Sequence, residues 1–220
     1  MMHNREDGMN TLITSGFSRI PLADEAFLLK GFLLGEDREI LAEVSDLSRE
    51  APFRHMVTPG GYSMSVSMTN CGPRGWVTDR QGYRYDTCDP LSGRPWPAMS
   101  PRFLRLAEAA AGASGFAGFK PDACLINRYV PGAKLSLHQD KDELDFSQPI
   151  VSFSLGLPAT FEFGGLTRKA PVTPWQLEHG DVVVWGGSSR LRYHSVRPLK
   201  KGTHPLLGDY RINMTFRCAG

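Results

Sequence analysis

The sequence is poor in cysteine and has no two cysteines at close spacing. Its four cysteines are scattered along 220 residues, and no C-x-x-C motif is present. This spacing indicates neither a zinc ribbon nor a thioredoxin-like redox motif. Because disulfides occur mainly in oxidising compartments, we expect four reduced thiols in a cytoplasmic protein. The cysteines are Cys71, Cys88, Cys124 and Cys218.

Long apolar runs and a strong excess of charge are also lacking. No stretch approaches the roughly 20 apolar residues that cross a bilayer, and the first ten residues, MMHNREDGMN, have no apolar region typical of a signal peptide. The 25 Lys and Arg against 23 Asp and Glu give a net charge of +2. We therefore expect no membrane partner, while nucleic-acid binding through a local basic patch is neither required nor excluded.

Composition predicts one compact domain in three segments. Hydrophobic residues make up 41% of the chain, which is enough for a sizeable core. Residues 1–50 are expected to hold a loose tail to about residue 20, a short apolar strand at 27–34 and a helix at 36–49, where apolar residues recur with a 3.6-residue period. The other segments are residues 51–98 and 99–220. No dimer-forming element is evident, so we expect a monomer.

Residues 59–97 are dense in Gly, Pro, Ser, Tyr, Trp and Arg. The alternating piece YSMSVSM predicts a hairpin strand, and the remainder is typical of turns. Its methionines, Met64 and Met68, suit either the hairpin core or an adaptable wall of a binding site. A helix is then expected from the Ser100 cap to about residue 115, with Phe103, Leu104 and Leu106 on its buried side.

From residue 123 onward, short strands are separated by Pro, Gly and Asp. Frequent turns without intervening helices predict a sandwich or barrel. In Tyr210–Arg217, apolar residues alternate with Arg211, Asn213, Thr215 and Arg217. The polar side faces either water or a barrel lumen that holds an anionic ligand. The expected strands are ACLINRY, KLSLHQD, IVSFSLG, TFEFGG, DVVVW, RYHSV and RINMTFR.

A His-x-Asp pair, His138 and Asp140, ends one alternating run. Side chains two apart in a strand point to the same face, so both can reach one ion. Together with a second histidine they would form the 2-His-1-carboxylate group of non-haem iron oxygenases. His194 lies in a strand-like run and suits this role better than His179 or His204.

A rival His-x-Asp pair, His179 and Asp181, lies at a glycine turn, where capping of the backbone is the simpler interpretation. An iron oxygenase of this kind also needs a dicarboxylate co-substrate. We expect Arg217 to bind its far carboxylate and Arg211 the other. Zinc is the competing metal, although its sites are usually closed or leave a single open position.

Several long motifs, in this order, resemble the AlkB family of Fe(II)- and 2-oxoglutarate-dependent DNA-repair dioxygenases. They run from about Pro52 to Phe216 and include MVTPGGYSMSVSMTNCG, RPWPAM, PDACLINRYVPGAKLSLHQDKDE, FGGL, LEHGDVVVWGG and RINMTFR. The resemblance implies a mainly β fold with flanking helices. Its core would be a double-stranded β-helix (jelly roll) over residues 99–220, and residues 51–98 would form a nucleotide-recognition lid.

The resemblance also implies Fe(II) as the metal, with 2-oxoglutarate and O2 as co-substrates, and it assigns site residues. The implied iron ligands are His138, Asp140 and His194. The implied 2-oxoglutarate contacts are Asn127, Tyr129, Arg211, Asn213 and Arg217. The implied substrate contacts are Trp76, Tyr83, Asp142 and Arg168, to which we add Met68.

The function that follows is oxidative dealkylation of bases such as 1-methyladenine and 3-methylcytosine, which repairs DNA directly and releases aldehyde, succinate and CO2. Because a base stacked in a duplex cannot reach such a site, we expect alkylated single-stranded DNA as partner, with double-stranded DNA and RNA as further substrates. Tyr85 would add a stacking surface, and Arg74, Arg80 and Arg84 would contact phosphates. The alternatives are the same chemistry on RNA, a protein or a small molecule, and a jelly-roll module that binds metal without turnover.

Overall fold

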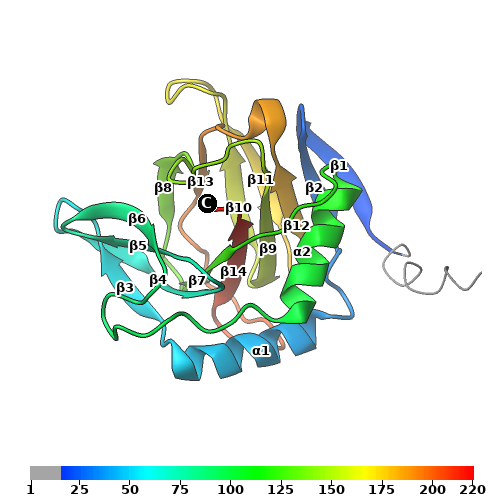
Figure 1. Cartoon of the computed structure of the whole chain (residues 1–220). Helices are drawn as coiled ribbons and strands as arrows, with labels where there is room; N and C mark the ends of the chain where they lie inside the picture. The colour runs from blue at the N-terminus through cyan, green and yellow to red at the C-terminus, as the bar shows by residue number, and fades with distance from the viewer. Residues whose placement is uncertain (1–15) are drawn as a thin grey trace, which may run out of the picture.

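The computed structural model describes residues 16–220 and places two antiparallel sheets face to face, with a separate hairpin beside them (Figure 1). Across the large sheet the order is β1 (Ser18–Ala23), β2 (Ala26–Lys30), β12 (Val182–Trp185), β9 (Ile150–Gly156), β14 (Arg211–Arg217), β7 (Ala123–Tyr129), β4 (Ser63–Cys71) and β3 (Arg54–Val57). The small sheet contains β11 (Thr173–Leu177), β10 (Ala159–Phe163), β13 (His194–Val196) and β8 (Leu135–His138). The hairpin pairs β5 (Gly75–Asp79) with β6 (Gly82–Asp86).

Apolar side chains of the two sheets meet between them. Leu28 and Val183 of the large sheet join Phe161 and Phe163 of the small sheet in one buried cluster. This two-sheet packing confirms the predicted jelly-roll core. The functional cavity lies between the same two sheets, and its lining comes from their strands, from the β5–β6 hairpin and from the loop after β8.

Two helices cover the outer face of the large sheet (Figure 1). Helix α1 (Asp37–Glu50) buries Ile40, Val44 and Leu47, which is the predicted 3.6-residue pattern. Helix α2 (Pro101–Ala113) begins as predicted, with the Ser100 hydroxyl accepting a hydrogen bond from the Phe103 amide at 3.2 Å. Leu104, expected on the buried side, is 38% exposed, because it lies on the flank that faces away from the sheet.

Three local predictions were wrong. The loose tail was expected to reach residue 20, but β1 begins at Ser18 and pairs with β2; residues 1–15 lie outside the described part of the chain. The segment at 75–86, predicted as turns, is the β5–β6 hairpin. Strand β11 was missed because Pro174 breaks its pattern, which the edge of the small sheet tolerates.

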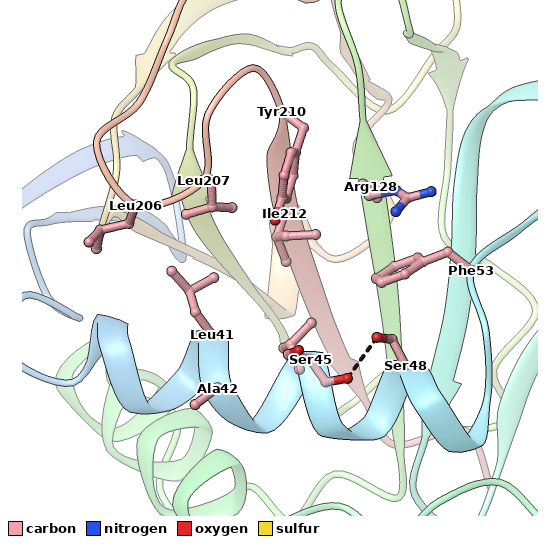
Figure 2. Close-up of a pocket in the computed structure, with 11 residues that line it drawn as sticks. Leu41, Ala42, Ser45, Ser48, Phe53, Arg128, Leu206, Leu207, Tyr210 and Ile212 are labelled. Atoms are coloured by element: carbon pink, nitrogen blue, oxygen red, sulfur yellow. Dashed lines mark hydrogen bonds between the residues drawn. The ribbon is translucent and has the colours of Figure 1, made fainter.

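One cavity between the sheets and another beside α1 indent the described residues. The larger, about 660 Å³, lies between the sheets and reaches the β5–β6 hairpin. The smaller, about 330 Å³, lies between α1 and the outer face of β7 and β14 (Figure 2). Of its lining residues only Arg128 is charged, with its guanidinium 4.9 Å from the centre of the Phe53 ring, and none is a His, Cys, Asp or Glu that could bind a metal.

The four cysteines are free, as predicted. Between residues 16 and 220 no helix is long and apolar enough to cross a membrane. The division into segments at residues 50 and 98 stays a prediction; β3 and β4, on the lid side of that boundary, are strands of the large sheet.

Candidate active site

One group of potential metal ligands lines the larger cavity. His138 ends β8, and His194 begins β13, directly opposite His138 in the strand pairing. Asp140 follows two residues after His138. One ligand atom from each of the three residues lies within 4.8 Å of the others. The predicted triad is therefore brought together by the pairing of β8 with β13.

Backbone carbonyls orient both imidazole rings. His138 Nδ1 lies 2.7 Å from the Ser136 carbonyl oxygen, and His194 Nδ1 lies 3.0 Å from the Arg192 carbonyl oxygen. A carbonyl only accepts, so each Nδ1 carries the proton and each Nε2 keeps a free lone pair. These lone pairs point toward Asp140, since Nε2 of His138 is 3.6 Å from Oδ1 and Nε2 of His194 is 3.8 Å from Oδ2. This tautomer is the one that binds a metal through Nε2.

The local charges favour the ligand forms of His194 and Asp140. Burial, then the neighbouring His138, lowers the pKa of His194 to about 4, so its ring is neutral at physiological pH. Burial alone would raise the pKa of Asp140, but Arg217 and the two histidines hold it below its ordinary value. A neutral imidazole pair and an ionised carboxylate are the donor set that Fe(II) takes in the 2-His-1-carboxylate group.

The rival His-x-Asp pair caps turns. His179 Nδ1 accepts a hydrogen bond from the Gly156 amide at 2.9 Å. Asp181 accepts from the amides of Gly31 and Glu178 at 2.9 and 2.8 Å. Since His179 Nδ1 and both Asp181 oxygens accept from backbone amides, the interpretation as turn caps is confirmed; His179 Nε2 lies 3.1 Å from Asp37 Oδ2.

Buried polar groups without partners lie beside the triad. In β14 and β7 the Arg211 Nε and Nη1, the Tyr129 hydroxyl and the Asn127 Oδ1 have no hydrogen-bond partner. Arg211 makes one bond, from Nη2 to the Ser154 hydroxyl at 2.9 Å, and is 1% exposed. A buried guanidinium and hydroxyl left unpaired are costly, so this region is built for an anion that completes their bonds.

The polar side of β14 faces this cavity, so its predicted position in a lumen is confirmed and the water-facing alternative was wrong; an anionic ligand there stays a prediction. Asn213 donates to the Ser152 hydroxyl and the Phe153 carbonyl at 2.8 and 2.9 Å, and it accepts from Asn127 at 3.1 Å. Burial raises the pKa of Tyr129 to about 12, so its hydroxyl stays a proton donor.

Arg217 was expected to bind the far carboxylate of the co-substrate, but its guanidinium contacts Asp140. Its Nη2 and Nε are 2.7 and 3.1 Å from Asp140 Oδ2, so it holds a ligand of the metal group instead of extending toward the unpaired donors. Since Arg211 has the free donors, the geometry favours the reverse of the predicted roles for the two arginines. The two-residue period of the strand placed both arginines in the lumen. It could not predict how deep in the cavity each arginine lies.

The β5–β6 hairpin forms the mouth of the cavity. The rings of Trp76 and Tyr83 stack with centroids 5.7 Å apart. Trp76 Nε1 donates to Asp142 Oδ2 at 2.8 Å, which joins the hairpin to the loop after β8. Met68, buried in β4, and exposed Arg168 also line the cavity. All five predicted substrate contacts therefore line one cavity.

Four side chains in or near the hairpin were expected to contact nucleic acid; three of them already have protein partners, and their contacts with nucleic acid stay predictions. Tyr85, expected as a stacking surface, donates its hydroxyl to buried Glu143 at 2.6 Å. Of the arginines expected to contact phosphates, Arg84 pairs with Asp79 at 2.9 Å and Arg74 lies 3.4 Å from Asp122. The structure thus leaves only the exposed Arg80 without an ion pair among the three.

Sequence reasoning missed Glu143 and Arg190. Both are buried, and Arg190 Nη2 bonds Glu143 Oε2 at 3.1 Å. The available signal was weak: three acidic residues, Asp142, Glu143 and Asp145, lie within five positions after a candidate metal ligand.

A jelly roll with a His-Asp-His group and an unpaired arginine beside it is the arrangement of Fe(II)- and 2-oxoglutarate-dependent oxygenases. A family model described as the 2OG-Fe(II) oxygenase superfamily matches residues 25–217. A solved structure described as OsALKBH1 superposes with a TM-score of 0.81 at 31% identity, over 91% of this chain and 100% of that one.

Within this class, the sequence is similar to enzymes of one kind. It is 59% identical over 200 residues to the alpha-ketoglutarate-dependent dioxygenase AlkB of Escherichia coli, covering 91% of this chain and 93% of that protein. It is 41% identical to an AlkB homolog of Caulobacter vibrioides, over 84% of this chain and 83% of that protein. The chain belongs to the AlkB family of alpha-ketoglutarate-dependent dioxygenases. It is an enzyme whose cofactor is Fe(II) and whose co-substrates are 2-oxoglutarate and O2.

Proposed function

We propose that this enzyme removes alkyl groups from the ring nitrogens of nucleic-acid bases and so repairs alkylated DNA directly. The observation that carries the proposal is the Trp76–Tyr83 stack beside Asp142, in the same cavity that the triad lines. Similar proteins include one named nucleic acid dioxygenase ALKBH1, of Mus musculus, and one named DNA N(6)-methyladenine demethylase ALKBH1C, of Arabidopsis thaliana.

We assign His138, Asp140 and His194 as the iron ligands. With 2-oxoglutarate and O2, bound Fe(II) supplies the oxidation that converts an N-methyl group to N-hydroxymethyl, giving succinate and CO2. The hydroxymethyl adduct then loses formaldehyde and leaves the repaired base. The protein positions the reactants and excludes water.

Arg211 binds the far carboxylate of 2-oxoglutarate, with Tyr129 donating its hydroxyl. Support comes from the unpaired Arg211 Nε and Nη1 and the Tyr129 hydroxyl, which together offer the donors that a carboxylate accepts. Asn127 and Asn213 form the neutral wall of this site. Arg217 orients Asp140 and lines the path between the metal group and the hairpin.

The alkylated base lies against Trp76 and Tyr83, with Met68 as an apolar wall and Arg168 as a contact at the rim. When the base binds, Asp142 accepts a hydrogen bond from the exocyclic amine of the base in place of the one from the Trp76 indole N–H. Its carboxylate also favours a cationic base such as 1-methyladenine or 3-methylcytosine. Since the cavity admits only an unstacked base, we propose single-stranded DNA as the preferred substrate. A cytoplasmic location and a monomeric state stay predictions.

Replacing Trp76 tests the hairpin's role. We expect Trp76→Ala to lower kcat/KM on single-stranded DNA containing 3-methylcytosine by about 5- to 150-fold, the value of one base-stacking contact of about 1–3 kcal/mol. Decarboxylation of 2-oxoglutarate without nucleic acid should be unchanged, because the triad and Arg211 are untouched. The measurement is formaldehyde and succinate release on matched single-stranded DNA, duplex DNA and RNA.

The matched control is Trp76→Phe, which keeps an aromatic face and should recover most of the lost activity. Equal losses of nucleic-acid turnover and uncoupled decarboxylation in Trp76→Ala would contradict the assignment of Trp76 to the base. Turnover faster on duplex than on single-stranded DNA would contradict the proposed strand preference.

A further inference from the structure

A buried carboxylate, Glu143, lies between the hairpin and the metal group. Its side chain is 1% exposed and follows three residues after Asp140. Oε1 accepts from the Tyr85 hydroxyl at 2.6 Å and lies 3.3 Å from Arg217 Nε, while Oε2 accepts from Arg190 Nη2 at 3.1 Å. A charge buried this deeply is retained only where its partners are fixed around it.

The two arginines that hold Glu143 also hold Asp140. Arg217 bonds the Asp140 carboxylate through Oδ2, and Arg190 Nη1 donates to the Asp140 backbone carbonyl at 2.8 Å. The side chain and the backbone of this proposed iron ligand are therefore both positioned by guanidinium groups that Glu143 holds in place. Oδ1 of Asp140 is left facing His138.

The same carboxylate reaches the hairpin. Tyr85 of β6 pairs with Trp76 of β5 in the strand register, so the two side chains belong to one rigid pair of strands. The hairpin is tied to the loop after β8 twice: by Trp76 to exposed Asp142, and by Tyr85 to buried Glu143. The Trp76–Asp142 hydrogen bond must break when a base donates to Asp142 in place of the indole N–H. The second is sealed from solvent and can stay closed.

We propose that Glu143 is a positioning residue that couples the hairpin to the metal group: it fixes Arg217 and Arg190 on Asp140 and anchors Tyr85 of the hairpin. The part that concerns nucleic acid rests on the proposed function, whereas the part that concerns the metal stands without it. Glu143 is assigned no direct contact with the metal or the base. It acts through its partners Tyr85, Arg190 and Arg217.

The metal part is tested with Co(II), a spectroscopic substitute for Fe(II), on the full chain without nucleic acid. We expect Glu143→Gln to weaken Co(II) binding by about 10- to 100-fold and to alter the visible Co(II) spectrum, as loss of an outer partner of a metal ligand does. The control is Glu108→Gln, an equal charge change on the exposed side of α2. A folded Glu143→Gln protein with wild-type affinity and spectrum would overturn the proposal.

Because Glu143 lies between two guanidinium groups, its neutralisation also lowers stability. A second variant, Glu143→Asp, keeps the charge and shortens the side chain, so it carries the same test should the first not fold. A purely structural role would lower the unfolding midpoint of this variant and leave its Co(II) spectrum unchanged. That combination would also overturn the proposal.

The hairpin part is tested with Tyr85→Phe, which removes only the hydroxyl. We expect KM for methylated single-stranded DNA to rise about tenfold, the value of one hydrogen bond to a charged group, with Co(II) affinity unchanged. Tyr210→Phe, a hydroxyl removed at the smaller cavity, is the control. An unchanged KM in Tyr85→Phe would overturn this part. Failure of the wild-type enzyme on every methylated nucleic acid would refute the proposed function and leave the Co(II) result to decide the metal part.

Discussion

Replacing Asp140 by alanine is expected to abolish turnover and leave the fold intact. The change removes one of three proposed iron ligands, so activity should fall by more than about 100-fold, since even an outer partner of a metal ligand is worth about 10–100-fold. The fold should survive because Arg217 keeps Glu143 as a carboxylate partner at 3.3 Å. The measurements are succinate release, Co(II) affinity and the circular dichroism of the variant.

The matched control for this prediction is His179→Gln, in the other His-x-Asp pair. Its ring bonds the Gly156 amide and Asp37, and it lies outside the metal group. We expect its activity to equal that of the wild type. Turnover that persists in Asp140→Ala, or that disappears in His179→Gln, would show that the metal lies elsewhere.

Replacing Arg211 by methionine is expected to destroy the affinity for 2-oxoglutarate and to spare the metal. Methionine keeps the length of the side chain but removes a buried charge whose Nε and Nη1 have no protein partner. Loss of one side of a buried, hydrogen-bonded charge pair costs about 2–5 kcal/mol, or roughly 30-fold to several thousandfold in Kd. The measurement is calorimetric titration of 2-oxoglutarate into Co(II)-loaded protein.

The comparison ligand for Arg211→Met is 2-oxobutyrate, which has the keto acid but lacks the far carboxylate. The wild type should discriminate strongly between the two compounds, and Arg211→Met should not. Arg217→Lys should instead weaken Co(II) binding, since Arg217 contacts Asp140 at 2.7 Å. Discrimination lost in Arg217→Lys and kept in Arg211→Met would restore the assignment predicted from the sequence.

Much of the site could be predicted because it lies on regular strands. The two-residue period of RINMTFR placed Arg211, Asn213 and Arg217 on one face, and the structure has that face lining the cavity. His138 and Asp140 were paired by the same period, although β8 ends at His138 and Asp140 lies in the loop that follows. His194 was chosen for its strand, and β13 pairs it directly with His138.

The remainder depends on contacts between segments distant in sequence. Local composition at 75–86 favoured turns, yet cross-strand pairing of Trp76 with Tyr85 makes a hairpin. Glu143 follows a run of charges and gave no sign of burial, because its partners Tyr85 and Arg190 are 58 and 47 residues away. The roles of the two arginines depend on depth in the cavity, which periodicity does not encode.

The most direct test is the product ratio from single-stranded DNA that contains 3-methylcytosine, with Fe(II), ascorbate, 2-oxoglutarate and O2. The account predicts one formaldehyde and one succinate for each cytosine restored, with all three products lost in Asp140→Ala. Succinate released by folded, iron-loaded enzyme without any formaldehyde or restored cytosine, on every methylated nucleic acid offered, would contradict it.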